Sequence, residues 1–140
     1  MTLVKKAVAF AAVLALSACA GMGGSSGKTV SVTLSGSEEV PPVATAARGS
    51  GSFTIGNDGS VKGSVSTTGV QGTMAHIHRG AKGQNGPVVI GLVKNGDTYA
   101  APDGAKLSEA DMSAFKAGNL YVNVHSAANK GGEVRAQLRP

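Results

Sequence analysis

Short runs in which apolar and polar residues alternate make up most of this chain after residue 28, and turn residues separate them. Residues 29–35 alternate valine and leucine with hydroxylic residues, the pattern of a strand with one buried face. Residues 51–55 and 60–66 repeat this pattern on either side of Asn57-Asp58-Gly59. An Asp-Gly turn between two alternating runs predicts a β-hairpin.

Similar patterns continue to the end of the chain. Further strands are expected at residues 73–78, 87–93, 98–100, 120–126 and 133–138. Residues 38–45 contain two consecutive prolines, which exclude a central strand and indicate a sheet edge or an extended crossover. About eight short strands joined by turns rich in glycine and asparagine are typical of an all-β fold, a Greek-key β-sandwich or barrel.

One short helix is expected among the strands, over about residues 107–117. Ser108 is a suitable N-cap, and Asp111 follows it at the spacing of a capping box. Gly118 suits the position just after the last helical turn, where glycine is favoured.

The first residues have the layout of a bacterial export signal. The apolar run at residues 7–16 follows two lysines and is too short for a membrane-spanning helix, which needs roughly 20 residues. The sequence Leu-Ser-Ala-Cys at residues 16–19 resembles a bacterial lipobox. We therefore expect residues 1–18 to be a lipoprotein signal peptide and Cys19 to be the lipidated first residue. Cleavage near Ala20, which would release a secreted protein, is the alternative.

A short tether is expected to join the lipid anchor to the folded part. Residues 19–27 are rich in glycine and serine and lack apolar periodicity, whereas residues 28–140 are long enough to form one domain with one core. A lipidated Cys19 would attach the protein to a membrane without spanning it. The expected location is the cell envelope, and by resemblance to Gram-negative lipoproteins Ala20 favours the outer membrane. Cys19 is the only cysteine, so no intramolecular disulfide can form.

The charge pattern argues against nucleic acid as a partner. The formal net charge is +5, and loss of Lys5 and Lys6 with the signal leaves 11 basic against 8 acidic residues, a charge of +3. The basic residues are scattered and aromatic residues are few, whereas nucleic-acid binding needs basic clusters or stacking platforms. A partner in the envelope is compatible with this surface, but no feature identifies it.

The three histidines suggest a metal site, which is the most specific chemical hypothesis that the sequence offers. His76 and His78 lie one residue apart in one expected strand, and His125 lies in another. Since side chains alternate along a strand, His76 and His78 point to the same side. Imidazole is the commonest metal ligand of proteins and suits copper and zinc. The alternative is a set of polar side chains on a half-buried sheet face, and both interpretations stay open.

Three further residues are expected around such a site. Met74 lies on the face of the paired histidines, although methionine more often fills a core. Asn123 shares a face with the third histidine. Arg135 either orients a histidine or attracts an anion, whereas the simpler interpretation is a surface ion pair with Glu133, which contributes little to stability.

Between the candidate metals, copper is favoured over zinc. Three imidazoles without a thiolate suit Cu(II) or Zn(II), and strand-borne histidines in an exported protein favour copper. A hydrolytic zinc site needs a water position and is expected to have a nearby acid, which the sequence does not identify. Cys19 is reserved for the anchor and no other catalytic arrangement is supported, so no residue is assigned a catalytic role.

Four segments resemble the chordin-type (CHRD) domain family, in the order in which that family has them. They are LSGSEEVPPV at residues 34–43, AHIH at 75–78, AGNLYVNVHS at 117–126 and NKGGEVRAQL at 129–138. The resemblance covers nearly all of the expected domain. It implies an all-β domain of a kind found in chordin and in many exported bacterial proteins, and it supplies no reaction.

A weaker resemblance links the histidines to Cu/Zn superoxide dismutase, a Greek-key β-sandwich with a His-x-His strand and a late Gly-x-Arg segment. His76, His78, His125 and Arg135 are reminiscent of those positions. A bridging histidine, a zinc loop and the stabilising disulfide are missing from this sequence. By this resemblance, a redox site here would hold a single metal ion.

The sequence therefore predicts an exported, lipid-anchored CHRD-domain binding protein that holds one metal ion, copper before zinc, through His76, His78 and His125. A metal-free protein-interaction module at the cell surface is the first alternative. An enzyme similar to superoxide dismutase is the second, and the sequence favours a binding protein over an enzyme.

Overall fold

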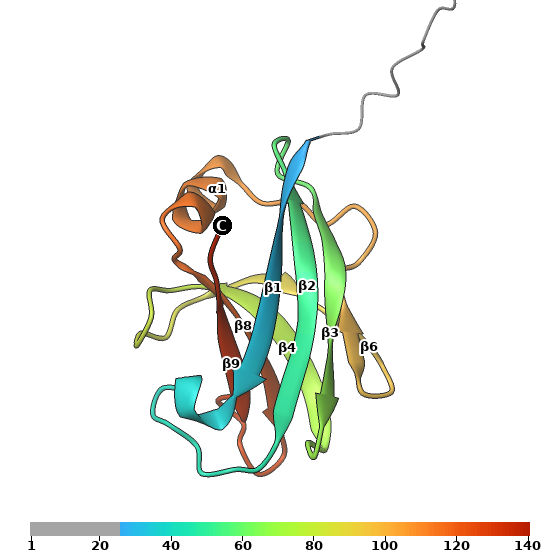
Figure 1. Cartoon of the computed structure of the whole chain (residues 1–140), viewed down its shortest axis with the longest axis vertical. Coiled ribbons are helices and arrows are strands. Elements are labelled where there is room, and N and C mark those ends of the chain that lie inside the picture. The colour runs from blue at the N-terminus through green and yellow to red at the C-terminus, as the bar shows by residue number, and fades with distance from the viewer. Residues whose placement is uncertain (1–25) are drawn as a thin grey trace, which may run out of the picture.

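The structure is a computed structural model that describes residues 26–140. Over these residues nine strands, a 3-10 helix and an α-helix follow one another (Figure 1). The strands are β1 (Gly27–Ser35), β2 (Arg48–Gly56), β3 (Val61–Thr68), β4 (Gly72–Arg79), β5 (Val88–Gly91), β6 (Val93–Asn95), β7 (Thr98–Ala100), β8 (Leu120–Ser126) and β9 (Val134–Leu138). The helices are η1 (Gly36–Glu38) and α1 (Glu109–Lys116).

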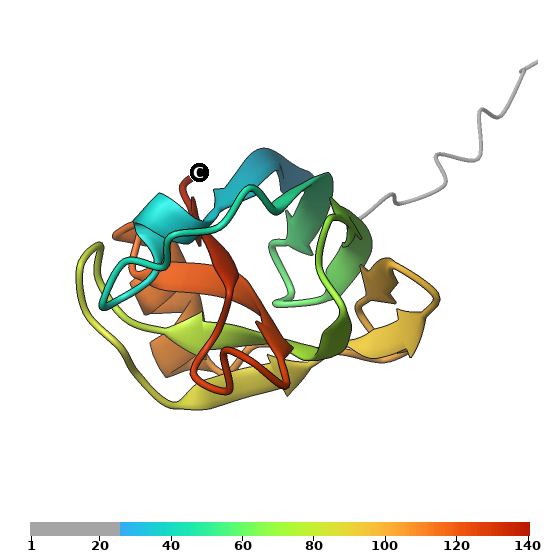
Figure 2. The ribbon, with the colours of Figure 1, turned by 90° about the horizontal axis from the view of Figure 1, so that it is seen from below.

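All strand pairs are antiparallel, and they form one sheet in the order β5-β4-β8-β9-β1-β2-β3-β7-β6. The link between β9 and β1 is narrow, because only Ser35 and Arg135 pair there. The edge strands β5 and β6 are joined through Leu92, whose N–H donates to the Ala75 carbonyl of β4. The sheet therefore curls into a nearly closed barrel, with β1 to β3 facing β4, β8 and β9 across the interior (Figure 2).

The all-β fold expected from the sequence is confirmed. Alternation along β1 buries Val30, Val32 and Leu34, and these side chains meet buried residues such as Val122 in the same core. The strand count is nine where about eight were expected. The difference arises at residues 87–93, where the chain breaks at Leu92 because β5 pairs with β4 whereas β6 pairs with β7.

The helix forms where its capping residues predict it, and it covers one end of the barrel (Figure 1). The Ser108 hydroxyl accepts a hydrogen bond from the Asp111 N–H at 3.1 Å. At the other end Gly118 has a φ of +74°, a conformation that favours glycine. Phe115 is the buried residue that fixes the helix to the core.

The proline-containing segment is an extended crossover and not a strand. After β1 the chain forms η1, and the following residues reach β2 without joining the sheet. The side chain of Glu39 is buried in this segment, with 3% exposed. The chain therefore buries a carboxyl group beside the sheet, which the sequence did not lead us to expect.

The expected signal peptide, the lipidated Cys19 and nearly all of the tether lie outside the described residues. The described part begins at residue 26, and β1 already begins at Gly27. Between residues 26 and 140, none of the helices combines the length and apolar character needed to cross a membrane.

Candidate metal centre

The pairing of β4 with β8 brings the three histidines together. In the register of these strands His76 lies opposite Asn123, and His125 lies opposite Met74. Ala75 and Ile77 are buried in the core, so alternation directs His76 and His78 to the outer face of the barrel wall. The predicted convergence of the three imidazoles on one sheet face is thus present in the structure.

The geometry of the cluster is compatible with one metal ion. One ring nitrogen from each of the three histidines lies within 4.8 Å of the other two. His76 Nδ1 and His125 Nε2 are 3.0 Å apart. Nitrogen ligands that share an ion at about 2.0–2.1 Å are ~3.0–3.4 Å apart, so modest side-chain rotation would bring all three onto one ion.

Backbone carbonyls hold two of the rings by their other nitrogen. His78 Nδ1 lies 2.9 Å from the Gly86 carbonyl, and His125 Nδ1 lies 2.8 Å from the Lys130 carbonyl. Because a carbonyl only accepts, each Nδ1 carries the hydrogen and each Nε2 is an acceptor, which in His125 accepts the hydrogen bond from His76 Nδ1. A ring N–H donated to a carbonyl in this way is the usual arrangement of a metal-binding histidine.

The free lone pair of His78 is buried. His78 is only 8% exposed, and its Nε2 has no hydrogen-bond partner among the described residues. A buried polar atom without a partner costs about 1–3 kcal/mol, and a metal ion would satisfy it. His76 is half-buried, which leaves the cluster open to solvent on one side.

The electrostatic surroundings keep two of the rings neutral. Burial lowers the pKa of His76, and charge on His125 and His78 lowers it further. Burial is also the main cause that lowers the pKa of His78, while its bond to Gly86 works in the opposite direction. Neutral imidazole is the form that binds metal, so these rings are ready to bind near neutral pH.

The rings of His78 and Tyr121 stack on each other, and the Arg135 guanidinium lies against Tyr121. The His78 and Tyr121 rings are parallel within 1°, with centroids 4.7 Å apart. The Arg135 guanidinium lies 3.4 Å from the centroid of the same tyrosine. Because β4 and β9 flank β8 on opposite sides, Tyr121 lies between the histidine and the arginine.

Arg135 corrects one expectation from the sequence. It is 1% exposed and forms no surface ion pair with Glu133, which instead accepts a hydrogen bond from Thr45. Its guanidinium donates to the Ala81 and Gln84 carbonyls of the loop after β4. That loop also contains the Gly86 carbonyl that accepts from His78. Arg135 therefore fixes the loop that orients the His78 ring.

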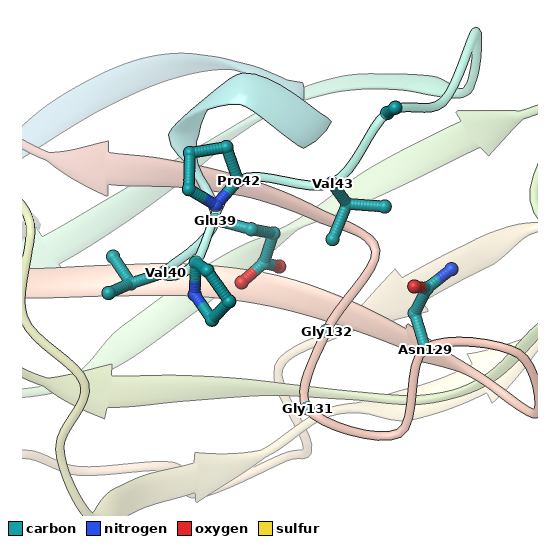
Figure 3. A pocket seen from close by; sticks show the side chains of 9 residues that line it. Glu39, Val40, Pro42, Val43, Asn129, Gly131 and Gly132 are labelled. Carbon is teal, nitrogen blue, oxygen red and sulfur yellow. The ribbon is translucent and has the colours of Figure 1, made fainter.

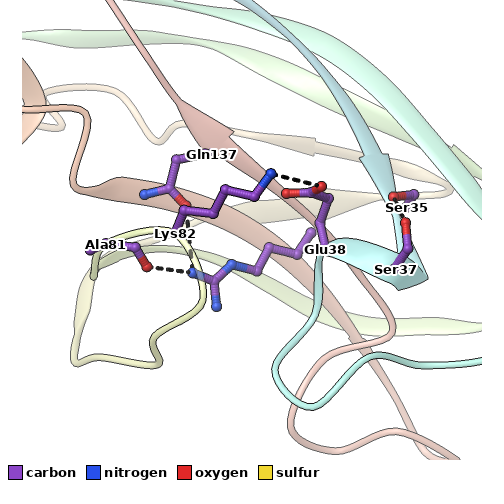
Figure 4. Close-up of polar contacts among 7 residues, drawn as sticks. Ser35, Ser37, Glu38, Ala81, Lys82 and Gln137 are labelled. Carbon is purple, nitrogen blue, oxygen red and sulfur yellow. Dashed lines mark hydrogen bonds and ion pairs between the residues drawn. The ribbon is translucent and has the colours of Figure 1, made fainter.

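The outer edge of this loop carries an ion pair. Lys82 Nζ lies 3.4 Å from Glu38 Oε1 at the end of η1, and Ala81 and Gln137 lie beside it (Figure 4). The pair links the loop to the crossover segment on the same side of the barrel. Both side chains are substantially exposed, so the pair adds little stability.

The expectation that Met74 fills the core is wrong. Its side chain is 51% exposed, because β4 begins at the rim of the sheet. It lies on the same face as the histidine cluster by alternation, opposite His125 in the register. Met112 on α1 does pack against the core, as methionine usually does.

Glu39 is the polar residue that sequence reasoning missed. An added Cβ at Gly132 would lie 2.4 Å from Glu39 Oε1 and 2.5 Å from Asn123 Nδ2, so the carboxyl and the amide meet at this glycine. Burial raises the pKa of Glu39 to about 7, although the Arg135 charge and hydrogen bonds from Asn123 and Val40 oppose the rise. The adjacent prolines indicated a crossover but gave no sign that this carboxyl turns inward.

A cleft opens beside this carboxyl. It has a volume of about 480 Å³ and lies between the proline-containing crossover and the loop before β9 (Figure 3). Val40, Pro42 and Val43 form one wall, while Asn129 and the glycines of the loop form the other. The cleft is thus separate from the histidine face but shares the 127–132 loop with it.

The family model of the CHRD domain matches residues 30–138. The chain belongs to the CHRD domain family. The match covers β2 to β9 and most of β1 and includes all three histidines, which confirms the resemblance noted in the sequence. Searches among curated proteins and among solved structures found no match to this CHRD protein.

Proposed function

We propose that this CHRD protein binds one metal ion through His76, His78 and His125. The observation that carries the proposal is the convergence of three ring nitrogens within 4.8 Å of one another. Two of these rings are held by backbone carbonyls through Nδ1, so that each Nε2 is an acceptor. The Nε2 of His78 has no partner among the described residues, and the hydrogen bond from His76 Nδ1 to the Nε2 of His125 is one that a metal ion would replace. A cluster of pre-oriented imidazoles binds a metal with little cost of reorganisation.

Copper is the metal that we favour. The donor set consists of imidazoles, without a thiolate among the described residues, and this set suits copper most strongly among the divalent first-row metals. Zinc is the second candidate, since it binds the same donors. The half-exposed His76 leaves a side from which an ion can enter and leave, so capture, storage and handover of the metal fit the arrangement.

We further propose that the binding domain acts at the cell envelope. The lipobox-like sequence that ends at Cys19 supports export and lipid attachment. A membrane is then a partner through the anchor, and in a Gram-negative cell the outer membrane is the expected site. The Gly/Ser-rich composition of residues 19–27 suits a tether between such an anchor and the domain.

Calorimetric titration tests the proposal. The purified protein without a histidine tag would be titrated with Cu(II), Cu(I) and Zn(II), beside a His76→Ala/His78→Ala/His125→Ala variant. We expect binding of one ion with a Kd below about 1 μM, near −8 kcal/mol, and its loss in the variant. Circular dichroism of the variant serves as the folding control, and equal binding by both proteins would contradict the proposal.

A metal-free interaction module is the second candidate, and the cleft beside Glu39 favours it. The cleft offers apolar walls and a buried carboxyl, which are features of a ligand site. This function predicts that partner binding survives replacement of all three histidines. An activity similar to that of superoxide dismutase would require turnover by the copper-loaded protein above that of free copper.

A further inference from the structure

Two buried acceptor atoms beside the histidine cluster lack a donor. Asn123 is 2% exposed, and its Oδ1 has no hydrogen-bond partner within residues 26–140. His78 Nε2 is in the same condition. Asn123 lies directly across from His76 in the register, so the amide belongs to the same sheet face as the imidazoles.

The direction of the Asn123 amide is fixed by its surroundings. Nδ2 donates to the Gly131 carbonyl at 3.3 Å, and the Glu39 carboxyl lies on the same side of the amide, where Glu39 Oε1 and Asn123 Nδ2 both approach Gly132. Both neighbours accept hydrogen bonds, so the NH₂ group must face them and Oδ1 must face the other way. The amide is also close enough to His78 to oppose the lowering of the pKa of that ring.

We propose that Asn123 Oδ1 is a fourth ligand of the metal ion, and that Glu39 is the positioning residue that aims it. Oδ1 and His78 Nε2 are both acceptors, so they cannot form a hydrogen bond with each other. One cation between them would satisfy both atoms. This inference rests on the proposed metal binding by the three histidines. It assigns to the buried Glu39 a role that the histidine motif alone does not indicate.

The added ligand changes which ions the site prefers. An amide oxygen is a hard, neutral donor, which suits divalent ions better than the soft Cu(I). The site then consists of three nitrogens and one oxygen, with the half-exposed side of His76 left open. We therefore infer selectivity for Cu(II) or Zn(II) over Cu(I).

Nuclear magnetic resonance of the wild-type protein gives a test that needs no variant. Zn(II) is diamagnetic, so the side-chain amide signals of Asn123 can be followed as the ion is added. Direct ligation predicts a large shift of these signals at one equivalent of Zn(II), together with the histidine rings. An Asn123 amide that does not move while the rings shift would overturn the fourth ligand.

Calorimetry with matched variants gives the second test. We expect Asn123→Leu to weaken Zn(II) binding about 10–100-fold and Asn123→Asp to retain it, because the aspartate keeps an oxygen in place. Glu39→Gln should weaken binding several-fold, since a glutamine amide no longer requires the Asn123 NH₂ to face it. Asn57→Ala, at an exposed asparagine that bonds Ser26, is the control and should bind as the wild type does.

The outcomes separate this inference from the proposed function. If Asn123→Leu binds Zn(II) as tightly as the control while the triple histidine variant does not bind, the fourth ligand is refuted and the three-histidine site stands. If the wild type binds no metal, the proposed function itself fails. If instead a proton bridges His78 and Asn123, the amide signals shift with pH and not with Zn(II), which also refutes the ligand.

Discussion

Replacing Glu39 with glutamine should change how the stability of the protein depends on pH. The pKa of Glu39 is raised from 4.5 to about 7, with burial as the main cause. A carboxyl whose pKa is higher in the folded state binds more protons folded than unfolded. The contribution of Glu39 to the unfolding free energy of the wild type is therefore fully present below pH 4.5, and it is lost as the pH rises through 7.

The magnitude follows from this rise in pKa. Moving the pKa from 4.5 to about 7 corresponds to at most roughly 3 kcal/mol of unfolding free energy. Partial solvent access to the cleft screens the carboxylate, so we expect a loss on the order of 2 kcal/mol between pH 4.5 and 8. Glutamine resembles the protonated acid and should not show this loss.

Urea denaturation in the presence of a chelator measures the effect without interference from metal. We expect wild type and Glu39→Gln to be similar at pH 4.5, and the variant to be more stable at pH 8 by about 2 kcal/mol. His76 and His78 have lowered pKa values, so they add stability as the pH rises to about 6.5, but they do so in both proteins. A stability difference that is the same at both pH values would refute the reasoning.

Four further predictions concern the remaining supports of the site. Arg135→Met should lower stability by roughly 3 kcal/mol, because it removes the donor of three part-buried acceptors, the Ala81 and Gln84 carbonyls and the Asn85 side-chain oxygen; a loss below 1 kcal/mol in urea denaturation would contradict this. Ser108→Ala should cost about 1 kcal/mol through the lost helix cap, with Zn(II) affinity unchanged in calorimetry. Since the pKa values of His76 and His78 are lowered, Zn(II) affinity should change little between pH 7 and 8 and fall below about pH 6; a steep fall already at pH 7.5 would argue against neutral rings. Met74→Leu should change stability by less than about 0.5 kcal/mol, because the side chain is half exposed; a larger change in thermal unfolding would contradict this.

Local sequence patterns predicted the elements that depend on local interactions. Successive side chains point to opposite sides of a strand, which is why the shared face of His76 and His78 could be assigned from residue order alone. Burial could not be assigned in this way, because β8 is buried at every position. The caps at Ser108 and Gly118 likewise depend only on nearby residues. The convergence with His125 required the additional knowledge that β4 and β8 are neighbours, which no local pattern supplies.

The residues whose burial was not predicted are those for which burial depends on contacts distant in the sequence. Arg135 follows the polar phase of β9, yet the loop after β4 folds over it and buries it. Glu39 stands beside prolines in a segment without periodicity, and its burial results from the 127–132 loop closing against it. Met74 lies in phase with the histidines, but its position near the start of β4 leaves it exposed. In each case tertiary packing decided the burial, not the strand pattern.

Long-range ¹H–¹⁵N correlation spectra of the histidines identify the ring nitrogens that bind Zn(II) and so test the three-histidine site itself. We expect Nε2 of His78, Nε2 of His125 and Nδ1 of His76 to show metal-bound shifts at one equivalent of Zn(II), with the His76 hydrogen moving from Nδ1 to Nε2. The Nδ1 hydrogens bonded to the Gly86 and Lys130 carbonyls should remain. Spectra in which these nitrogens do not respond, or in which the ion binds a single exposed ring, would contradict it.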